Sequence, residues 1–306
     1  MSETLTPIRS RSALRRLHVG RSRRLAIHHA AEHFFLKEYA HKVYFQGLLN
    51  TGISFERIPR IEEMNDILAK IEWGAVAVDG FIPPAAFMEF QAYKVLVIAC
   101  DMRQIHHIEY TPAPDIVHEA AGHAPIIVDR EYSNYLQRFG EVGAKAMSSR
   151  KDFELYQAIR HLSILKERPN ADPKEVDEAT EAGRASTEKS RRDPPEMALL
   201  SRLHWWTVEY GLIGTLENPK IYGAGLLSSI GESVSCLEPA VKKIPYSIDA
   251  QNCAFDITTK QPQLFVCRDF QHLKDVARRI CQQDGVQSWR TRRHQQSDRM
   301  QQHCDL

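Results

Sequence analysis

The sequence predicts a mostly α-helical domain with a minor β-sheet late in the chain, an α+β fold. Apolar residues recur at helical spacing across residues 139–147, 153–165 and 199–213, which is typical of amphipathic helices. Short β-like runs at residues 244–248 and 263–266 predict the sheet. The chain has 306 residues, of which 43% are hydrophobic, enough for one large domain with a substantial core.

The two ends of the chain differ in composition from the rest. Residues 1–32 are rich in arginine and poor in acids, which is typical of a transit peptide or of a disordered basic tail, and we expect the tail. Residues 287–306 lack an apolar period and predict a polar tail. The folded domain is therefore expected to cover residues 33–286. The arginines of the first segment are Arg9, Arg11, Arg15, Arg16, Arg21, Arg23 and Arg24.

A surface helical insertion is expected at about residues 148–198. Its centre, residues 166–196, is charged and is interrupted by prolines, which end helices. Because helical patterns flank it, the insertion is expected to extend helices rather than to add a domain. The prolines are Pro169, Pro173, Pro194 and Pro195.

Residues 118–123, His-Glu-Ala-Ala-Gly-His, place two imidazoles five residues apart in an apolar segment. Asp115 is a good N-cap for a helix here, and Gly122 and Pro125 are expected to end it after two turns. In an α-helix this spacing sets the side chains about 140° apart at roughly 100° per residue, unlike the four-residue spacing of the zinc-protease signature. We therefore expect a broken helix, with His123 at its end, if both imidazoles bind one ion.

A pair of imidazoles without thiolate partners suits zinc or non-haem iron, and one further carboxylate would complete an iron site with open positions. The alternative for His118 and His123 is a pair of ordinary helix-end histidines. A bare pair favours that alternative, so the metal site depends on a third ligand.

Glu209 is the candidate third ligand. It shares its side of the predicted helix with Trp205 and Leu212, and a carboxylate among such neighbours is costly unless it is paired or binds a metal. Metal ligation and a salt bridge to Arg202 or Lys220 both meet this need, and the segment alone leaves the choice open. The buried stripe of this helix is expected at Leu199, Leu203, Trp206, Tyr210 and Ile213.

Three blocks of sequence resemble the tetrahydropterin-dependent aromatic amino acid hydroxylases, in the same order. Residues 110–125, Tyr-Thr-Pro-Ala-Pro-Asp-Ile-Val-His-Glu-Ala-Ala-Gly-His-Ala-Pro, resemble the iron-binding segment of that family. Residues 205–211 resemble its carboxylate-ligand helix, and residues 222–232 resemble a following active-site segment. Two upstream stretches, residues 56–64 and 78–87, also fit.

The resemblance covers roughly residues 33–280 and is greatest to a longer branch of the bacterial phenylalanine 4-hydroxylases. It implies the catalytic-domain fold of the hydroxylases and assigns Fe(II) to His118, His123 and Glu209. Two neutral imidazoles and one carboxylate would cancel one of the two iron charges and leave positions for dioxygen.

The resemblance also implies a tetrahydropterin, tetrahydrobiopterin or a bacterial variant, which supplies electrons that iron alone does not. In the family the pterin ring stacks on an aromatic side chain, here Phe87. A short loop brackets it, here Gly80, Phe81 and Ile82. Glu119 is placed near both pterin and iron. Judged by itself, Phe87 is typical of a residue that fills core.

Arg103 is implied as the bidentate partner of the amino acid carboxylate, oriented by Asp115, although by itself it is typical of a surface arginine. An aromatic contact from Trp205 would wall the ring pocket. The implied substrate-binding residues are Arg103, Thr111, Pro114, Asp115, Trp205 and Ser228, and the implied catalytic residues are Glu119 and Trp205.

The sequence therefore predicts an iron(II)- and tetrahydropterin-dependent monooxygenase that uses dioxygen to hydroxylate an aromatic amino acid, with L-phenylalanine giving L-tyrosine. Tryptophan or a modified phenylalanine is the alternative substrate. An impaired iron-binding member of the family is a further alternative. The last is a zinc hydrolase with Glu119 as its base, which the five-residue spacing disfavours.

Composition argues against several other classes. The net charge of +1 disfavours nucleic acid as a partner. No apolar run approaches the ~20 residues that span a membrane, and no secretory signal is apparent, so a cytoplasmic enzyme without a membrane partner is expected. The cysteines lack Cys-x-x-Cys spacing, which favours reduced thiols over structural zinc or disulfides. They are Cys100, Cys236, Cys253, Cys267, Cys281 and Cys304.

Overall fold

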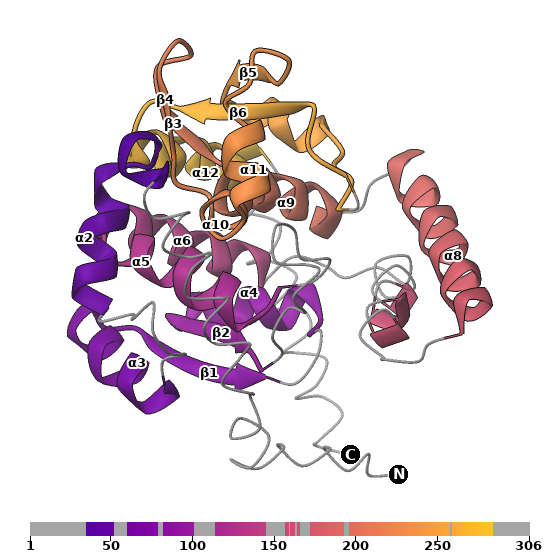
Figure 1. Ribbon diagram of the computed structural model, residues 1–306, viewed down its shortest axis with the longest axis horizontal. Coiled ribbons are helices and arrows are strands. Elements are labelled where there is room, and N and C mark those ends of the chain that lie inside the picture. Colours follow the sequence, from indigo (N-terminus) through magenta and orange to yellow (C-terminus); the bar gives the residue numbers. More distant parts are fainter. Residues whose placement is uncertain are drawn as a thin grey trace, which may run out of the picture.

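The computed structural model is built mainly from helices, with two small sheets on opposite sides of the helical body (Figure 1). This confirms the predicted fold class. The predicted tails, residues 1–32 and 287–306, lie outside the described residues. The structure describes residues 35–51, 60–78, 82–100, 114–144, most of 157–165, 172–192, 196–257 and 259–283.

The amino-terminal part combines helices with a two-stranded parallel sheet. Strand β1 (Gly74–Val78) pairs with β2 (Val95–Ala99), and α4 (Pro84–Ala92) crosses between them. Pro84 begins α4 because its fixed φ suits the first helical turn. Sequence analysis did not anticipate this sheet, since its short apolar runs carry no alternation. The preceding elements are α2 (Lys42–Thr51), α3 (Ile61–Leu68) and the 3₁₀ turn η2 (Ala69–Ile71).

Helix α6 (Arg130–Gly143) lies at the centre of the core. The side chain of Asp129 caps it by accepting from the backbone amides of Glu131 and Tyr132. Gly140 allows α6 to approach α4, because a Cβ there would lie 2.5 Å from the backbone nitrogen of Ala92. The largest fully buried side chains in this core are Trp206, Tyr132, Tyr135, Tyr222 and Phe139.

The carboxyl-terminal part forms a four-stranded sheet in the order β4-β3-β6-β5. Strand β3 pairs antiparallel with β4 and parallel with β6, and β5 pairs parallel with β6. Strand β6 falls at the second predicted run, 263–266, whereas β5 overlaps the first run, 244–248, only at residues 244 and 245. The elements are β3 (Leu212–Gly214), β4 (Pro219–Ile221), α10 (Ala224–Leu227), α11 (Ile230–Ser235), β5 (Lys242–Pro245), η6 (Ile248–Asn252), β6 (Gln263–Cys267) and α12 (Phe270–Gln283).

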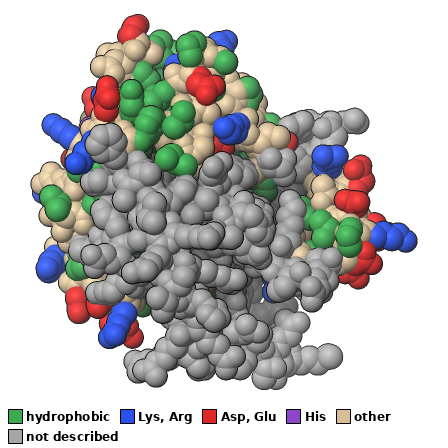
Figure 2. Space-filling model, viewed as in Figure 1, with side chains coloured by type: hydrophobic (Ala, Val, Ile, Leu, Met, Phe, Trp, Pro, Cys, Tyr) green, Lys and Arg blue, Asp and Glu red, His purple; other side chains and the backbone are tan. Residues whose placement is uncertain are grey.

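Helix α8 (Pro173–Arg192) falls in the predicted insertion and lies beside the main body, at the right of Figure 1. Most of its described side chains are exposed, with Ala179 buried. Both acidic and basic side chains lie on its coloured surface, at the right of Figure 2. None of the described helices is long and apolar enough to cross a membrane. The cysteines whose side chains the structure describes, Cys100, Cys236, Cys253 and Cys267, form no disulfide.

Candidate metal centre

The two histidines lie on one continuous helix, which corrects the expectation that Gly122 and Pro125 end it. Helical residues begin at Ile116, residues 118–123 form a π-helix, and α5 (Ala124–Ile127) follows directly. A π-helix has an i→i+5 hydrogen-bond pattern. Residues five apart therefore come to the same face, and both imidazoles can reach one point without a break in the helix.

Glu209 also lies at the end of a π-helix. Helix α9 (Glu196–His204) passes into the π-helix η5 (Trp205–Glu209), whose pattern shows in the 2.8 Å bond from the amide of Tyr210 to the carbonyl of Trp205. The predicted helix over residues 199–213 is therefore too long, because the chain enters β3 at Leu212. Of the predicted stripe, Leu203, Trp206, Tyr210 and Ile213 are buried, whereas Leu199 is half-buried.

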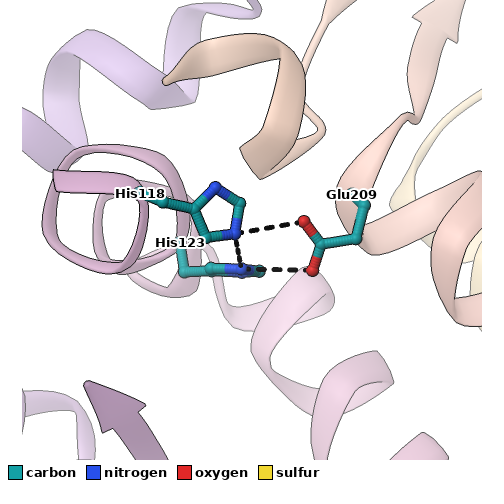
Figure 3. Close-up of side chains that lie close together, drawn as sticks. All are labelled: His118, His123 and Glu209. Carbon is teal, nitrogen blue, oxygen red and sulfur yellow. Dashed lines mark hydrogen bonds and ion pairs between the residues drawn. The ribbon is translucent and has the colours of Figure 1, made fainter. Parts of the chain in front are cut away.

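The three predicted ligands point toward one another from these two helices (Figure 3). Nε2 of His118 lies 3.2 Å from Oε2 of Glu209, and Nε2 of His123 lies 3.3 Å from Oε1. The two Nε2 atoms are 3.0 Å apart. Lys220 instead donates to the carbonyl of Glu38, and Arg202 donates to that of Gln251.

Ser228 determines which nitrogen of His118 faces the cluster. Its hydroxyl donates to the carbonyl of Ala224 at 2.8 Å and lies 2.9 Å from Nδ1 of His118. The serine oxygen therefore accepts from Nδ1–H, and in the neutral imidazole the lone pair is left on Nε2, which faces Glu209. This is the arrangement in which outer partners orient metal-binding histidines.

Charges within the cluster shift its pKa values. Burial alone would raise the pKa of Glu209, but His123 and His118 outweigh it and hold that pKa well below the usual value. Burial opposes protonation of His123, whereas Glu209 and Glu119 together raise its pKa to about 9. Burial raises the pKa of Glu119, whose Oε2 lies 3.8 Å from Nε2 of His123.

Two glycines let the segments of the site approach closely. A Cβ on Gly122 would lie 2.7 Å from the carbonyl oxygen of Ala224, so the first π-helix packs directly on α10. A Cβ on Gly223 would lie 2.4 Å from the carbonyl oxygen of Glu209. Gly223, within residues 222–232, therefore has a packing role.

The donor set fits a divalent transition metal. One ligand atom from each of His118, His123 and Glu209 lies within 4.8 Å of the other two. Two imidazoles and one carboxylate on one side of an ion are typical of non-haem Fe(II) sites with open positions. The side chains are 7%, 5% and 15% exposed, so little surrounding water competes with them.

The other predicted site residues divide into three groups. Phe87 and Ile82 are half-buried, and Pro114 is exposed. Asp115 is buried and accepts from the amide of His118 at 2.9 Å, as expected of an N-cap. Four predicted residues lie outside the described residues: Gly80, Phe81, Arg103 and Thr111.

Trp205 is held between two aromatic rings. It stacks on Tyr210 with centroids 4.6 Å apart and on Phe255 at 4.3 Å. Sequence analysis missed Phe255, because no local pattern connects it with Trp205.

Sequence analysis also missed His204 and Gln91. Both are buried, and their Nε2 atoms are 3.1 Å apart. Nothing in the local sequence distinguishes either side chain from an ordinary helical residue.

Comparison with curated proteins finds similar sequences among phenylalanine-4-hydroxylases. The chain is 28% identical over 236 residues to that of Chromobacterium violaceum and 29% identical over 238 residues to that of Ralstonia nicotianae. These matches cover 76% and 77% of this chain. They cover 64% and 62% of the relatives, so the chain spans less than two thirds of their length.

Solved structures of the Chromobacterium violaceum phenylalanine hydroxylase have a similar fold. The one with bound oxidized Fe(III) has a TM-score of 0.67 at 25% identity and covers 86% of this chain and 81% of that chain. The one with iron(III) and oxidized 7,8-dihydrobiopterin has a TM-score of 0.68 at 25% identity, with coverages of 88% and 84%.

A family model also matches most of the chain. The model for the biopterin-dependent aromatic amino acid hydroxylases matches residues 26–168 and 170–288, most of the chain. The matched ranges contain all three residues of the metal-ligand cluster. The chain therefore belongs to the biopterin-dependent aromatic amino acid hydroxylase family.

Proposed function

We propose that this protein is an iron(II)- and tetrahydropterin-dependent monooxygenase that hydroxylates L-phenylalanine to L-tyrosine with dioxygen. The observation that carries the proposal is the convergence of His118, His123 and Glu209 in a chain of this family. The names of the relatives support phenylalanine as substrate. The iron and dihydrobiopterin of the similar structures support the cofactors.

Fe(II) would be held by the Nε2 atoms of His118 and His123 and by the carboxylate of Glu209. When bound, iron and a tetrahydropterin together supply the activation of dioxygen. The protein keeps Glu209 ionised through the two histidines and presents the lone pair of His118 through Ser228. Both effects prepare the donors for a cation before it arrives.

Side chains around the cluster would hold the organic reactants. Phe87 is half-buried, and a partly exposed aromatic ring suits stacking of a planar pterin. Trp205 is fixed between Tyr210 and Phe255, and it would form a wall of the pocket for the amino acid ring. Arg103 would bind the carboxylate of the amino acid.

The test is a turnover experiment with a defined mixture of substrates. The purified protein is loaded anaerobically with Fe(II) and then mixed with tetrahydrobiopterin, dioxygen, phenylalanine, tryptophan and tyrosine, and the products are identified by mass. Glu209→Ala removes a ligand. Glu217→Ala is the matched control, because Glu217 is an exposed carboxylate after β3.

Tyrosine formed from phenylalanine by the wild type and by Glu217→Ala, but not by Glu209→Ala, would support the proposal. Hydroxylated tryptophan as the main product would keep the class of reaction and replace the substrate. Absence of any hydroxylated product from a protein that binds both Fe(II) and pterin would overturn the proposed activity.

A further inference from the structure

A buried polar pair joins α4 to α9 beside the metal-ligand cluster. Gln91 of α4 and His204 of α9 are 5% and 7% exposed, and their Nε2 atoms lie 3.1 Å apart. The amide nitrogen of Gln91 can only donate, so Nε2 of His204 accepts and its proton is on Nδ1. The pair therefore fixes both the tautomer and the orientation of the imidazole.

The same imidazole also contacts Phe87. The two rings cross at 81° with their centroids 5.5 Å apart, an edge-to-face arrangement. Phe87 and Gln91 are four residues apart on α4 and so lie on one face of that helix. His204 thus contacts that face twice, once through a hydrogen bond and once through a ring. The ring of Phe139 packs against its imidazole at 5.8 Å.

His204 also borders the helix that carries a metal ligand. It is the last residue of α9, and the π-helix that ends at Glu209 begins at the next residue. Burial lowers the pKa of His204 to about 4, with Glu209 acting in the opposite direction. The imidazole is therefore neutral near pH 7 and adds no positive charge beside Glu209.

We propose that His204 is a positioning residue that sets the Phe87 ring, and the pterin stacked on it, relative to the iron ligand Glu209. This inference rests on the proposed function, because it takes Phe87 as the pterin platform. Gln91 holds the imidazole, the imidazole holds Phe87, and the backbone of η5 connects the imidazole to Glu209. A substitution of His204 therefore displaces the pterin relative to the metal and leaves the three metal ligands in place.

Calorimetry of 7,8-dihydrobiopterin binding to the full chain tests the role of Phe87 as pterin platform directly, without turnover. His204→Leu removes both contacts, His204→Phe keeps a ring without the hydrogen bond, and His204→Gln keeps a polar partner without the ring. His41→Leu is the matched control, because His41 is a partly buried imidazole in edge contact with Phe270 at 5.3 Å.

We expect His204→Leu to raise the Kd for dihydrobiopterin roughly tenfold, equivalent to about 1.4 kcal/mol. Fe(II) affinity, measured by competition with a chelator, should stay within twofold of wild type, a difference of about 0.4 kcal/mol. In turnover, the KM for pterin should rise more than the KM for the amino acid. More tetrahydropterin should also be oxidised per hydroxylated product. His41→Leu should leave the Kd for dihydrobiopterin and the pterin oxidised per product unchanged.

The double variant Gln91→Leu with His204→Phe separates positioning from loss of stability. Replacing both polar partners by apolar groups avoids an unpaired buried amide, so this variant should recover more pterin affinity than His204→Phe alone. If His204→Leu does not fold, the double variant provides the test in its place.

If wild type, His204→Leu, His204→Phe and His204→Gln all bind dihydrobiopterin equally and oxidise equal tetrahydropterin per hydroxylated product, the role of His204 is overturned while the proposed function stands. A wild-type protein that binds no dihydrobiopterin would overturn the proposed function, and this inference with it.

Discussion

Ser228 and His118 are joined by a 2.9 Å hydrogen bond that spans 110 residues of sequence. Because the serine hydroxyl also donates to Ala224, it accepts from Nδ1 of His118, and Nε2 is left for a metal. The resemblance implied Ser228 as a substrate contact, and that role stays a prediction. The structure adds a second role, orientation of a metal ligand.

Ser228→Ala should weaken Fe(II) binding by about 10- to 100-fold, the usual cost of losing an outer partner of a metal-binding histidine. Without the hydroxyl, either nitrogen of His118 can carry the proton. Competition with a chelator under anaerobic conditions measures the affinity. Ser233→Ala is the control, since that buried hydroxyl bonds to the carbonyls of Leu226 and Ser229 instead. Equal losses in both variants would contradict the prediction.

Gly122→Ala should destabilise the site. The added Cβ would lie 2.7 Å from the carbonyl oxygen of Ala224, and overpacking of this kind costs about 1–3 kcal/mol. Thermal denaturation should show a lower Tm. Fe(II) affinity should also fall, because Ala224 at the start of α10 accepts the hydrogen bond of Ser228, which orients His118.

Gly183→Ala provides the contrast on α8, where the nearest atom to a new Cβ is Cδ2 of Leu162 at 4.0 Å. Alanine is favoured over glycine inside a helix by roughly 0.5–1 kcal/mol. A small rise in Tm is therefore expected there. An unchanged Tm in Gly122→Ala would argue against the close contact with α10.

Glu232 should make the stability of the protein depend on pH. Burial raises its pKa from 4.5 to about 7, with Lys260 opposing the shift, and its Oε1 has no hydrogen-bond partner among the described residues. The folded state therefore keeps a proton that the unfolded state releases. This contribution to stability is present below pH 4.5 and is lost as the pH rises through 7.

Glu232→Gln removes that titration, so its Tm relative to wild type should rise between pH 4.5 and 8 by a few degrees, since 1 kcal/mol corresponds to roughly 2–4 °C in a domain of this size. Glu238→Gln makes the same change at an exposed carboxylate. A pH-independent difference for Glu232→Gln would refute the assignment.

Arg103→Ala should raise the KM for the amino acid by roughly 10- to 100-fold, because a hydrogen bond to a charged group contributes about 1.5–3 kcal/mol. The KM for pterin should change little. Steady-state kinetics with each reactant varied in turn separates the two. Arg184→Ala, at an exposed position on α8, controls for the loss of one positive charge. Unchanged amino acid kinetics would exclude a carboxylate contact.

Much of the fold and the metal-ligand set could be predicted from sequence. Strand β6 and part of β5 lie where short β-branched and aromatic stretches stand between turns, because strand propensity is local. His118, His123 and Glu209 could be named because their donor chemistry is a property of each side chain, and because three ordered blocks resemble one family. The insertion was expected to extend helices because helical patterns flank it, and α8 lies within it.

The helix geometry at the ligands could not be predicted that way. The i→i+5 pattern of residues 118–123 and 205–209 departs from the regular α-helix. Only the packing of neighbouring segments stabilises it. Local signals therefore predicted the wrong ends for both helices. Gly122 was predicted to end its helix, yet Gly122 and Gly223 both allow close contacts with distant backbone.

The residue types and spacings of this chain determined which atoms could hold a metal. The tertiary structure decided how those atoms are oriented and what surrounds them. Ser228 meets His118 across 110 residues, and Gln91 meets His204 across 113. Such contacts depend on how whole helices pack, because hydrogen bonding and side-chain fit between distant segments are satisfied jointly and leave no periodic trace in either segment.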